Sequence, residues 1–133
     1  MAVLGAGQMG NGITQVAACA GIEVVMIDIK QEFVDRGIAT IEKSLAKLVS
    51  KERMSQEDAD SARAKISTST DRSVCSDVDL VVEAVPEILD LKISIFSELD
   101  GICKPDCILA SNTSSISIST IAESTNRPDK VIG

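Results

Sequence analysis

The sequence predicts an α/β fold, a doubly wound parallel sheet that carries a helical projection after its second strand. Three observations indicate this class. Short apolar runs alternate with helical patterns along the 133 residues, as expected of repeated strand–helix–strand units. A glycine-rich turn follows the first apolar run, and the second run ends in an acid. We expect the whole chain, residues 1–133, to form a single domain.

The first strand, at residues 2–4, leads into a Gly-x-Gly-x-x-Gly turn formed by Gly5, Gly7 and Gly10. The first glycine permits the tight turn, the second lets a pyrophosphate approach the backbone, and the third lets the next helix pack closely on the strand. That helix, over residues 9–20, would direct its free N–H groups and its positive dipole end at the phosphates.

The second strand, residues 23–27, ends in Asp28, eighteen residues past the last glycine of the turn. A carboxylate there would accept hydrogen bonds from the 2′-hydroxyl of an adenosine ribose and would repel a 2′-phosphate. Strand, glycine turn, helix, strand and terminal acid together form the Rossmann-type dinucleotide-binding fingerprint. The sequence therefore predicts NAD as the cofactor, although Lys30 leaves some room for NADP.

Two helical segments after Asp28 predict the projection from the sheet. Apolar residues recur at three- and four-residue steps along residues 31–51, which gives one apolar stripe. The stripe consists of Val34, Ile38, Ile41, Leu45 and Leu48. Ser55 is expected to cap a second, shorter helix. Ser44, Lys47 and Lys51 form a basic line on another side of the first helix, and spacing alone favours a solvated face there.

The next elements continue the alternation of strands and helices. Residues 66–70 suit an edge strand, and residues 79–85 are apolar enough for a central strand. Pro86 is expected at the first position of the following helix, with Glu87 in its positive first turn. The apolar residues that this helix is expected to present to the core are Ile88, Leu91, Ile95 and Leu99.

A fifth strand, residues 107–110, delivers the polar run 111–115 to the carboxyl edge of the sheet, where ligands bind in this architecture. The small hydroxyl and amide side chains of this run can bond to a ligand or cap the next helix, and both interpretations stay open. Residues 116–123 are predicted as a short helix. Residues 130–133 begin a sixth strand, and a chain that stops there is expected to be a fragment.

Composition excludes several classes of function. A net charge of −7 and 2% aromatic residues leave neither a basic surface nor a stacking platform for nucleic acid, and no basic attraction to an acidic membrane. No apolar run reaches the ~20 residues that span a bilayer. The four cysteines lack zinc-ligand spacing, so we expect reduced thiols, no metal site and a cytoplasmic location. The chain has no histidine, the usual general base near neutral pH.

Three segments occur in a distinctive order and spacing. They are Gly5-Ala6-Gly7-Gln8-Met9-Gly10-Asn11-Gly12-Ile13, Val82-Glu83-Ala84-Val85-Pro86-Glu87 and Ser111-Asn112-Thr113-Ser114-Ser115. Together they resemble the N-terminal NAD-binding domain of the 3-hydroxyacyl-CoA dehydrogenases, including the 3-hydroxybutyryl-CoA enzymes. The third segment is the most discriminating, because many Rossmann enzymes share the glycine turn and few share that loop.

The resemblance implies a set of site residues. Those for NAD are Gly5, Gly7, Gln8, Met9, Gly10, Asp28, Ala84, Glu87, Lys92 and Asn112. Asn112 and Ser114 are implied as the catalytic residues of this domain, where the nicotinamide meets the substrate's 3-hydroxyl. Ser44 and Lys51 are implied to hold the CoA part of an acyl-CoA substrate. With this resemblance, a CoA-binding role for the basic line and a merely solvated helix face are equally favoured.

The full enzymes of this family oxidise (3S)-3-hydroxyacyl-CoA to 3-oxoacyl-CoA with NAD. Their catalytic histidine, its glutamate partner and a helical C-terminal domain with the dimer interface all correspond to positions after Gly133. This chain is therefore expected to bind NAD without turnover, and to form a homodimer only with the missing domain. Two alternatives stay open, the cofactor domain of another β-hydroxyacid dehydrogenase and a non-catalytic nucleotide-binding module.

Overall fold

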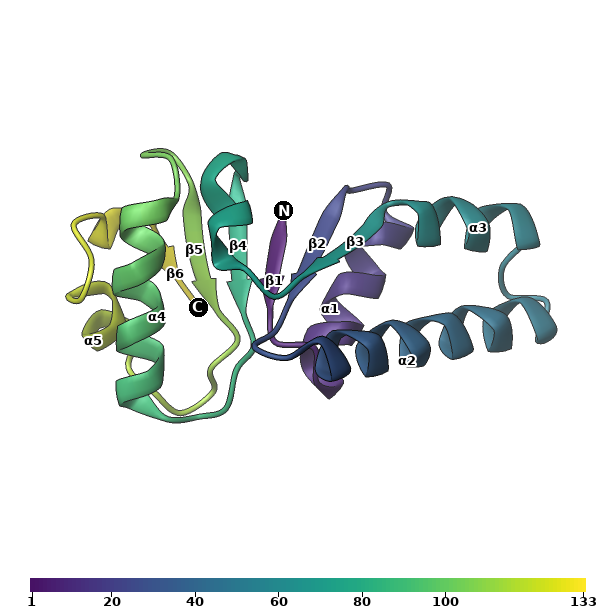
Figure 1. The fold of residues 1–133 in the computed structure, drawn as a ribbon, viewed down its shortest axis with the longest axis horizontal. Coiled ribbons are helices and arrows are strands. Elements are labelled where there is room, and N and C mark those ends of the chain that lie inside the picture. Colours follow the sequence, from purple (N-terminus) through teal and green to yellow (C-terminus); the bar gives the residue numbers. More distant parts are fainter.

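The computed structural model describes all residues from 1 to 133. A six-stranded sheet lies at its centre, with every neighbouring pair parallel and the order β3-β2-β1-β4-β5-β6 (Figure 1). The strands are β1 (Ala2–Leu4), β2 (Val24–Ile27), β3 (Ile66–Ser69), β4 (Leu80–Glu83), β5 (Ile108–Ser111) and β6 (Val131–Ile132). The strand order reverses between β1 and β4, which confirms the doubly wound, Rossmann-type fold.

Helices cover both faces of this sheet. They are α1 (Gln8–Cys19), α2 (Gln31–Ser50), α3 (Gln56–Ala64), α4 (Leu89–Ile102) and α5 (Ile118–Ala122), with the 3₁₀-helices η1 (Arg72–Asp77) and η2 (Pro128–Lys130). The pair α2–α3 extends beyond the edge strand β3 and forms the expected helical projection (Figure 1). None of the helices combines the length and the apolar character needed to cross a membrane.

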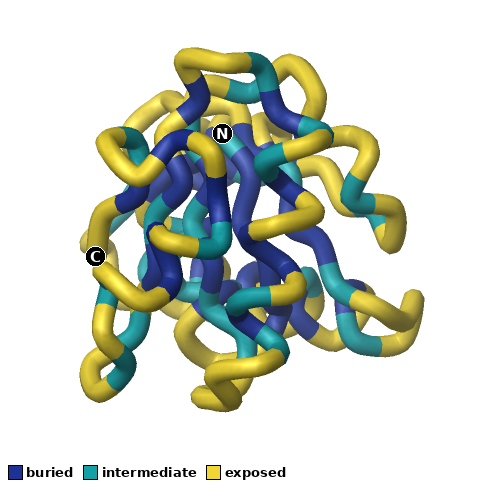
Figure 2. The backbone as a smooth tube through the Cα atoms, turned by 90° about the vertical axis from the view of Figure 1, so that its left-hand side faces the viewer, coloured by how far each residue is buried: buried dark blue, intermediate teal, exposed yellow.

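Alternating side chains of the strands divide the core into two layers. In β1, Val3 packs with residues of α1, α2 and α3, whereas Ala2 and Leu4 pack with residues of α4 and α5 on the opposite face. Burial on both faces explains why the central strands read as apolar runs. Figure 2 shows the consequence, a buried interior enclosed by exposed loops and helix faces.

The projection follows the sequence pattern closely. Within the predicted stripe of α2, Val34, Ile41 and Leu45 are buried, and the remaining two side chains are half-buried. At the start of α3 the Ser55 hydroxyl accepts a hydrogen bond from the Asp58 N–H at 3.0 Å. The apolar stripe and the helix cap are both confirmed.

The start of α4 differs from the prediction. The helix begins at Leu89 with Ile88 as its N-cap residue, so Pro86 is not its first residue and Glu87 is not in its first turn. The Ile88 side chain is 55% exposed rather than part of the core. The cause is tertiary: hydroxyl groups of the loop after β5 bind the Glu87 carboxylate, which holds this segment outside the helix.

Candidate functional site

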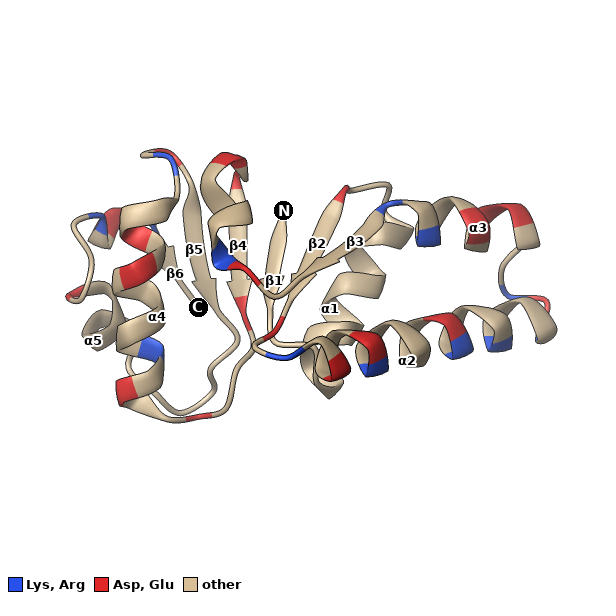
Figure 3. Cartoon of the chain, viewed as in Figure 1, with Lys and Arg blue, Asp and Glu red and all other residues tan.

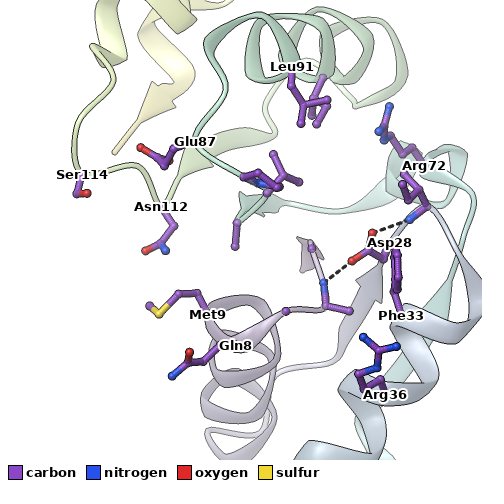
Figure 4. Close-up of a pocket in the computed structure, with 18 residues that line it drawn as sticks. Gln8, Met9, Asp28, Phe33, Arg36, Arg72, Glu87, Leu91, Asn112 and Ser114 are labelled. Atoms are coloured by element: carbon purple, nitrogen blue, oxygen red, sulfur yellow. Dashed lines mark hydrogen bonds between the residues drawn. The ribbon is translucent and has the colours of Figure 1, made fainter.

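A cavity of about 920 Å³ opens at the carboxyl edge of the sheet, beside the reversal of strand order between β1 and β4. This volume is typical of a site for a small molecule or cofactor. The predicted site residues that line it are Gly5, Gly7, Gln8, Met9, Asp28, Ala84, Glu87, Asn112 and Ser114 (Figure 4). Gly10, Lys92, Ser44 and Lys51 do not line it.

The glycine turn forms one wall of this cavity. Gly5 has φ +105°, and a Cβ atom there would lie 2.5 Å from the Ala84 carbonyl oxygen. A Cβ atom on Gly10 would lie 1.8 Å from the Gly5 carbonyl oxygen, so this glycine packs α1 against the strand. Gly7 is exposed on the cavity, with no protein atom within 4 Å of an added Cβ. The space beside Gly7 is therefore open to a ligand.

The N-terminus of α1 suits an anion. Its N-cap residue, Gly7, provides no side-chain hydrogen bond, and the first turn carries no acid. The first N–H groups of a helix have no partner within the helix, and the dipole places partial positive charge there. Open backbone beside these N–H groups is the arrangement that binds a pyrophosphate. The residues of this turn thus fit the phosphates of a dinucleotide.

Asp28 lies directly beside the glycine turn. Its Oδ2 accepts the Ala6 N–H at 2.8 Å, and its Oδ1 accepts the Ile29 N–H at 2.7 Å (Figure 4). These two bonds fix the carboxylate at the end of β2. A carboxylate oxygen can accept more than one hydrogen bond, so Asp28 retains capacity for the hydroxyls of a ribose.

Sequence reasoning missed the side chains that surround Asp28. Phe33 and Arg36 from α2, and Arg72 from η1, line the same end of the cavity (Figure 4). The Arg36 guanidinium and the Lys30 ammonium lie 5.9 and 5.6 Å from the Phe33 ring centre. Lys30 itself does not line the cavity. The spacing of Phe33 and Arg36 on the first turns of α2 could have indicated this position, whereas nothing in the sequence places Arg72 there.

A group of charged side chains lies under the opposite end of the cavity. Glu83 and Lys92 are completely buried, and the Lys92 ammonium lies 2.6 Å from Glu83 Oε2. The same ammonium lies 3.0 Å from Glu87 Oε1. Glu83 Oε1 accepts the Ser111 hydroxyl at 2.6 Å. Lys92 thus lies behind Glu87, and Glu87 is the member of this group that lines the cavity.

The polar run after β5 has two alternating roles. The hydroxyls of Thr113 and Ser115 bind Glu87 Oε2 at 2.6 and 2.8 Å, and that of Ser111 binds Glu83. The intervening Asn112 and Ser114 line the cavity (Figure 4). The cap of α5 comes from Ser117, outside this run. The helix-cap interpretation is therefore wrong, and the run binds the β4 end and its loop while its alternate side chains line the cavity. Its ligand-binding role stays a prediction.

These contacts keep Glu87 ionised at acidic pH. Hydrogen bonds from Thr113, Ser115 and Lys92 lower the pKa of Glu87 from 4.5 to about 2. A carboxyl whose pKa is lowered by folding stabilises the protein above its unfolded pKa, and this contribution is lost as pH falls through the folded pKa. We expect Thr113→Val to raise the pKa of Glu87, as followed by carboxyl carbon NMR during acid titration.

The control for this titration is Thr68→Val, which removes an exposed hydroxyl from the edge strand β3. The Glu87 midpoint is expected to stay at about 2 in that variant. An unshifted Glu87 midpoint in Thr113→Val would show that the Thr113 hydroxyl does not hold the carboxylate.

The proposed CoA residues lie on the projection. Ser44 is half-buried on α2, and Lys51 is exposed at the C-cap of that helix, which is its far end from the sheet (Figure 1). Acidic and basic residues both occur along α2 (Figure 3). The structure does not bring this pair to the cavity, and their role stays a prediction.

Comparison with known proteins agrees with this geometry. Residues 1–133 match the family described as 3-hydroxyacyl-CoA dehydrogenase, NAD binding domain. The chain is 49% identical over 131 residues to a probable 3-hydroxybutyryl-CoA dehydrogenase of Deinococcus radiodurans, which covers 98% of this chain and 47% of that protein. It is 41% identical over 133 residues to a peroxisomal fatty acid beta-oxidation multifunctional protein of Arabidopsis thaliana, covering 100% of this chain and 18% of that protein.

Solved structures give the same result. The crystal structure of (S)-3-hydroxybutyryl-CoA dehydrogenase from Ralstonia eutropha has a TM-score of 0.95 and 45% identity, over 98% of this chain and 46% of that one. The chain therefore spans about half the length of the 3-hydroxybutyryl-CoA dehydrogenases it matches.

Proposed function

This chain belongs to the 3-hydroxyacyl-CoA dehydrogenase family, as its NAD-binding domain, and we propose that it holds NAD in an enzyme that oxidises (3S)-3-hydroxyacyl-CoA to 3-oxoacyl-CoA. The observation that carries the proposal is the cavity at the strand reversal. Its lining combines the open glycine turn and Asp28 at one side with Asn112 and Ser114 at the other.

Each part of the lining has a proposed task. The N–H groups at the start of α1 would bind the pyrophosphate, and Asp28 would accept hydrogen bonds from the adenosine ribose. Glu87 would bind the ribose on the nicotinamide side, with Asn112 at the nicotinamide and Ser114 orienting the substrate's 3-hydroxyl. When bound, NAD supplies the hydride acceptor. The protein's share of the work is to hold both reactants in one geometry.

We place the binding of the CoA portion and the catalytic base outside the cavity. We assign the CoA portion to Ser44 and Lys51 on α2, where an ammonium suits a phosphate as a compact charge. The chain has no histidine, and we propose that the proton acceptor lies outside residues 1–133. We propose the same for any homodimer interface. A cytoplasmic location is supported by the four free thiols, since lasting disulfides form in oxidising compartments.

The direct test is titration of the purified chain with NADH, followed by cofactor fluorescence, with and without Asp28→Ala. We expect saturable binding that weakens about tenfold in the variant, the order of a lost hydrogen bond to a charged group. The gap between NADH and NADPH affinity should narrow, because the carboxylate no longer repels a 2′-phosphate. Asp35→Ala is the matched control, because it removes an exposed carboxylate of α2 that does not line the cavity.

An unchanged NADH-to-NADPH ratio in Asp28→Ala would mean that Asp28 is not the ribose ligand. Circular dichroism of the variant separates that outcome from misfolding. Mixing the chain with NADH and acetoacetyl-CoA should give no turnover, and saturable turnover would overturn the proposal that the base lies outside these residues.

A further inference from the structure

Glu83, Lys92 and Glu87 form a charged triad under one end of the cofactor cavity. The Lys92 ammonium stands between the two carboxylates, 2.6 Å from Glu83 and 3.0 Å from Glu87. Lys92 and Glu83 are both completely buried, whereas the Glu87 side chain is 43% exposed and lines the cavity. One ammonium against two carboxylates leaves the triad with one net negative charge.

Hydrogen bonds and an ion pair surround Glu83. The Ser111 hydroxyl accepts the Thr113 N–H at 3.2 Å and donates to Glu83 Oε1 at 2.6 Å. Glu83 Oε2 accepts the Val85 N–H at 2.7 Å and the Lys92 ammonium at 2.6 Å. A hydroxyl, a backbone N–H and an ammonium thus surround this carboxyl group. The Lys92 ammonium, 2.6 Å away, pairs with Glu83 as a carboxylate, so this negative charge is fully buried.

The location of Glu83 connects this charge to the cavity. Glu83 is the last residue of β4 and pairs in register with Leu4 of β1 and Ser111 of β5. It thus lies at the edge of the sheet where the cavity opens. The other charged residues that line the cavity, Asp28, Arg36 and Arg72, lie at its opposite end (Figure 4). Glu87 is the charged residue of the lining nearest Asn112 and Ser114, and it belongs to the triad.

Burying a carboxylate costs desolvation free energy, so a contact between two loops does not by itself require one. Apolar side chains of similar volume often replace a buried ion pair without loss of stability. A charge that faces a cofactor cavity has a further effect, because water is displaced from the site and the field is screened less than at an open surface. The nicotinamide ring is cationic in NAD⁺ and neutral in NADH, so a nearby net charge acts differently on the two forms.

We propose that the triad's net negative charge favours oxidised over reduced nicotinamide, and that Glu83 supplies this excess charge as a positioning residue acting through Lys92 and Glu87. The inference rests on the proposed function, because it takes the nicotinamide to lie beside Glu87, Asn112 and Ser114. It goes beyond that function by naming a buried residue, outside the cavity lining, that sets the redox preference of the site.

The test is the ratio of NADH to NAD⁺ dissociation constants of the purified chain, from NADH fluorescence and competition by NAD⁺. Glu83→Gln keeps the shape of the side chain and makes the triad neutral. We therefore expect the NADH-to-NAD⁺ ratio of dissociation constants to fall about fivefold, which favours NADH. Lys92→Met added to Glu83→Gln leaves Glu87 as the one charge, restores the net value of −1, and should return the ratio to that of the wild type.

Two further variants complete the design. Glu87→Gln neutralises the triad from its exposed side and keeps the buried Glu83–Lys92 pair, so it should shift the ratio in the same direction even where Glu83→Gln does not fold. Asp90→Asn is the control, since it removes an equal charge from an exposed residue of α4 outside the cavity lining. Its ratio should stay within twofold of the wild type, because solvent screens an exposed charge.

A structural role for Glu83 would weaken the binding of both forms alike and leave the ratio unchanged. An unchanged ratio in folded Glu83→Gln, or in Glu87→Gln where the former does not fold, overturns the inference while the proposed function stands. Failure of the folded wild-type chain to bind either form overturns the proposed function instead.

Discussion

Replacing Gly10 by alanine is expected to lower the free energy of unfolding by about 3 kcal/mol or more, at the upper end of what overpacking costs in a tightly packed core. The added Cβ would lie 1.8 Å from the Gly5 carbonyl oxygen and 2.7 Å from its carbon. Both are backbone atoms, so no side-chain rotation relieves the clash. Helix α1 must move away from β1, and its N-terminus then leaves the phosphate position.

The measurements for Gly10→Ala are urea unfolding and NADH titration, and we expect no detectable NADH binding. Gly12→Ala provides the control within the same helix, because an added Cβ there meets no atom within 4 Å. The free energy of unfolding of that variant should rise by about 0.5–1 kcal/mol, the ordinary preference of a helix for alanine over glycine. Normal NADH affinity in Gly10→Ala would show that close packing of α1 on the strand is dispensable.

Arg127→Met is expected to lower the free energy of unfolding by about 3 kcal/mol, because removing one partner of a buried ion pair leaves an uncompensated charge. The Arg127 guanidinium lies 2.6 Å from Asp100 Oδ1, and both side chains are about nine-tenths buried. It also donates to four backbone carbonyls between the last turn of α4 and the start of β5, those of Asp100, Cys103, Lys104 and Cys107. Arg127 thus joins α4 to the segment that precedes β6.

The effect of Arg127→Met should depend on pH. Burial would raise the pKa of Asp100, but hydrogen bonds from Asn126 and Arg127 outweigh it and hold the pKa below its usual value of 3.8. The stabilisation is therefore present above the unfolded pKa and is lost as pH falls through the folded pKa. We expect the difference in unfolding free energy between wild type and variant to shrink in acid.

Two variants bracket this result. Arg127→Lys retains the charge but not the planar fork that reaches several carbonyls, so it should recover part of the loss. Arg63→Met removes an exposed pair with Glu42, and it should cost at most about 1 kcal/mol. Equal losses in Arg63→Met and Arg127→Met would contradict the importance of the buried contacts.

Local patterns explain which elements could be predicted. The glycine turn, Asp28 and the cap at Ser55 depend on residues within a few positions or within one strand–helix–strand unit. The start of α4 could not be predicted in the same way. Its Glu87 is held by Thr113 and Ser115, which are 26 and 28 residues further along the chain, and these bonds outweigh the local preference of an acid for a helix N-terminus.

Sequence alone determined the fold class, the cofactor and the order of the elements, because strand and helix periods and the glycine spacing are local properties of the chain. The family followed from the resemblance of three segments to a known family. The tertiary structure decided which side chains line the cavity and which support them. In residues 111–115, odd-numbered hydroxyls bind the carboxylates of Glu83 and Glu87, and even-numbered side chains line the cavity. Such a division, like the burial of Glu83 with Lys92, arises only when parallel strands bring distant loops to one edge of the sheet.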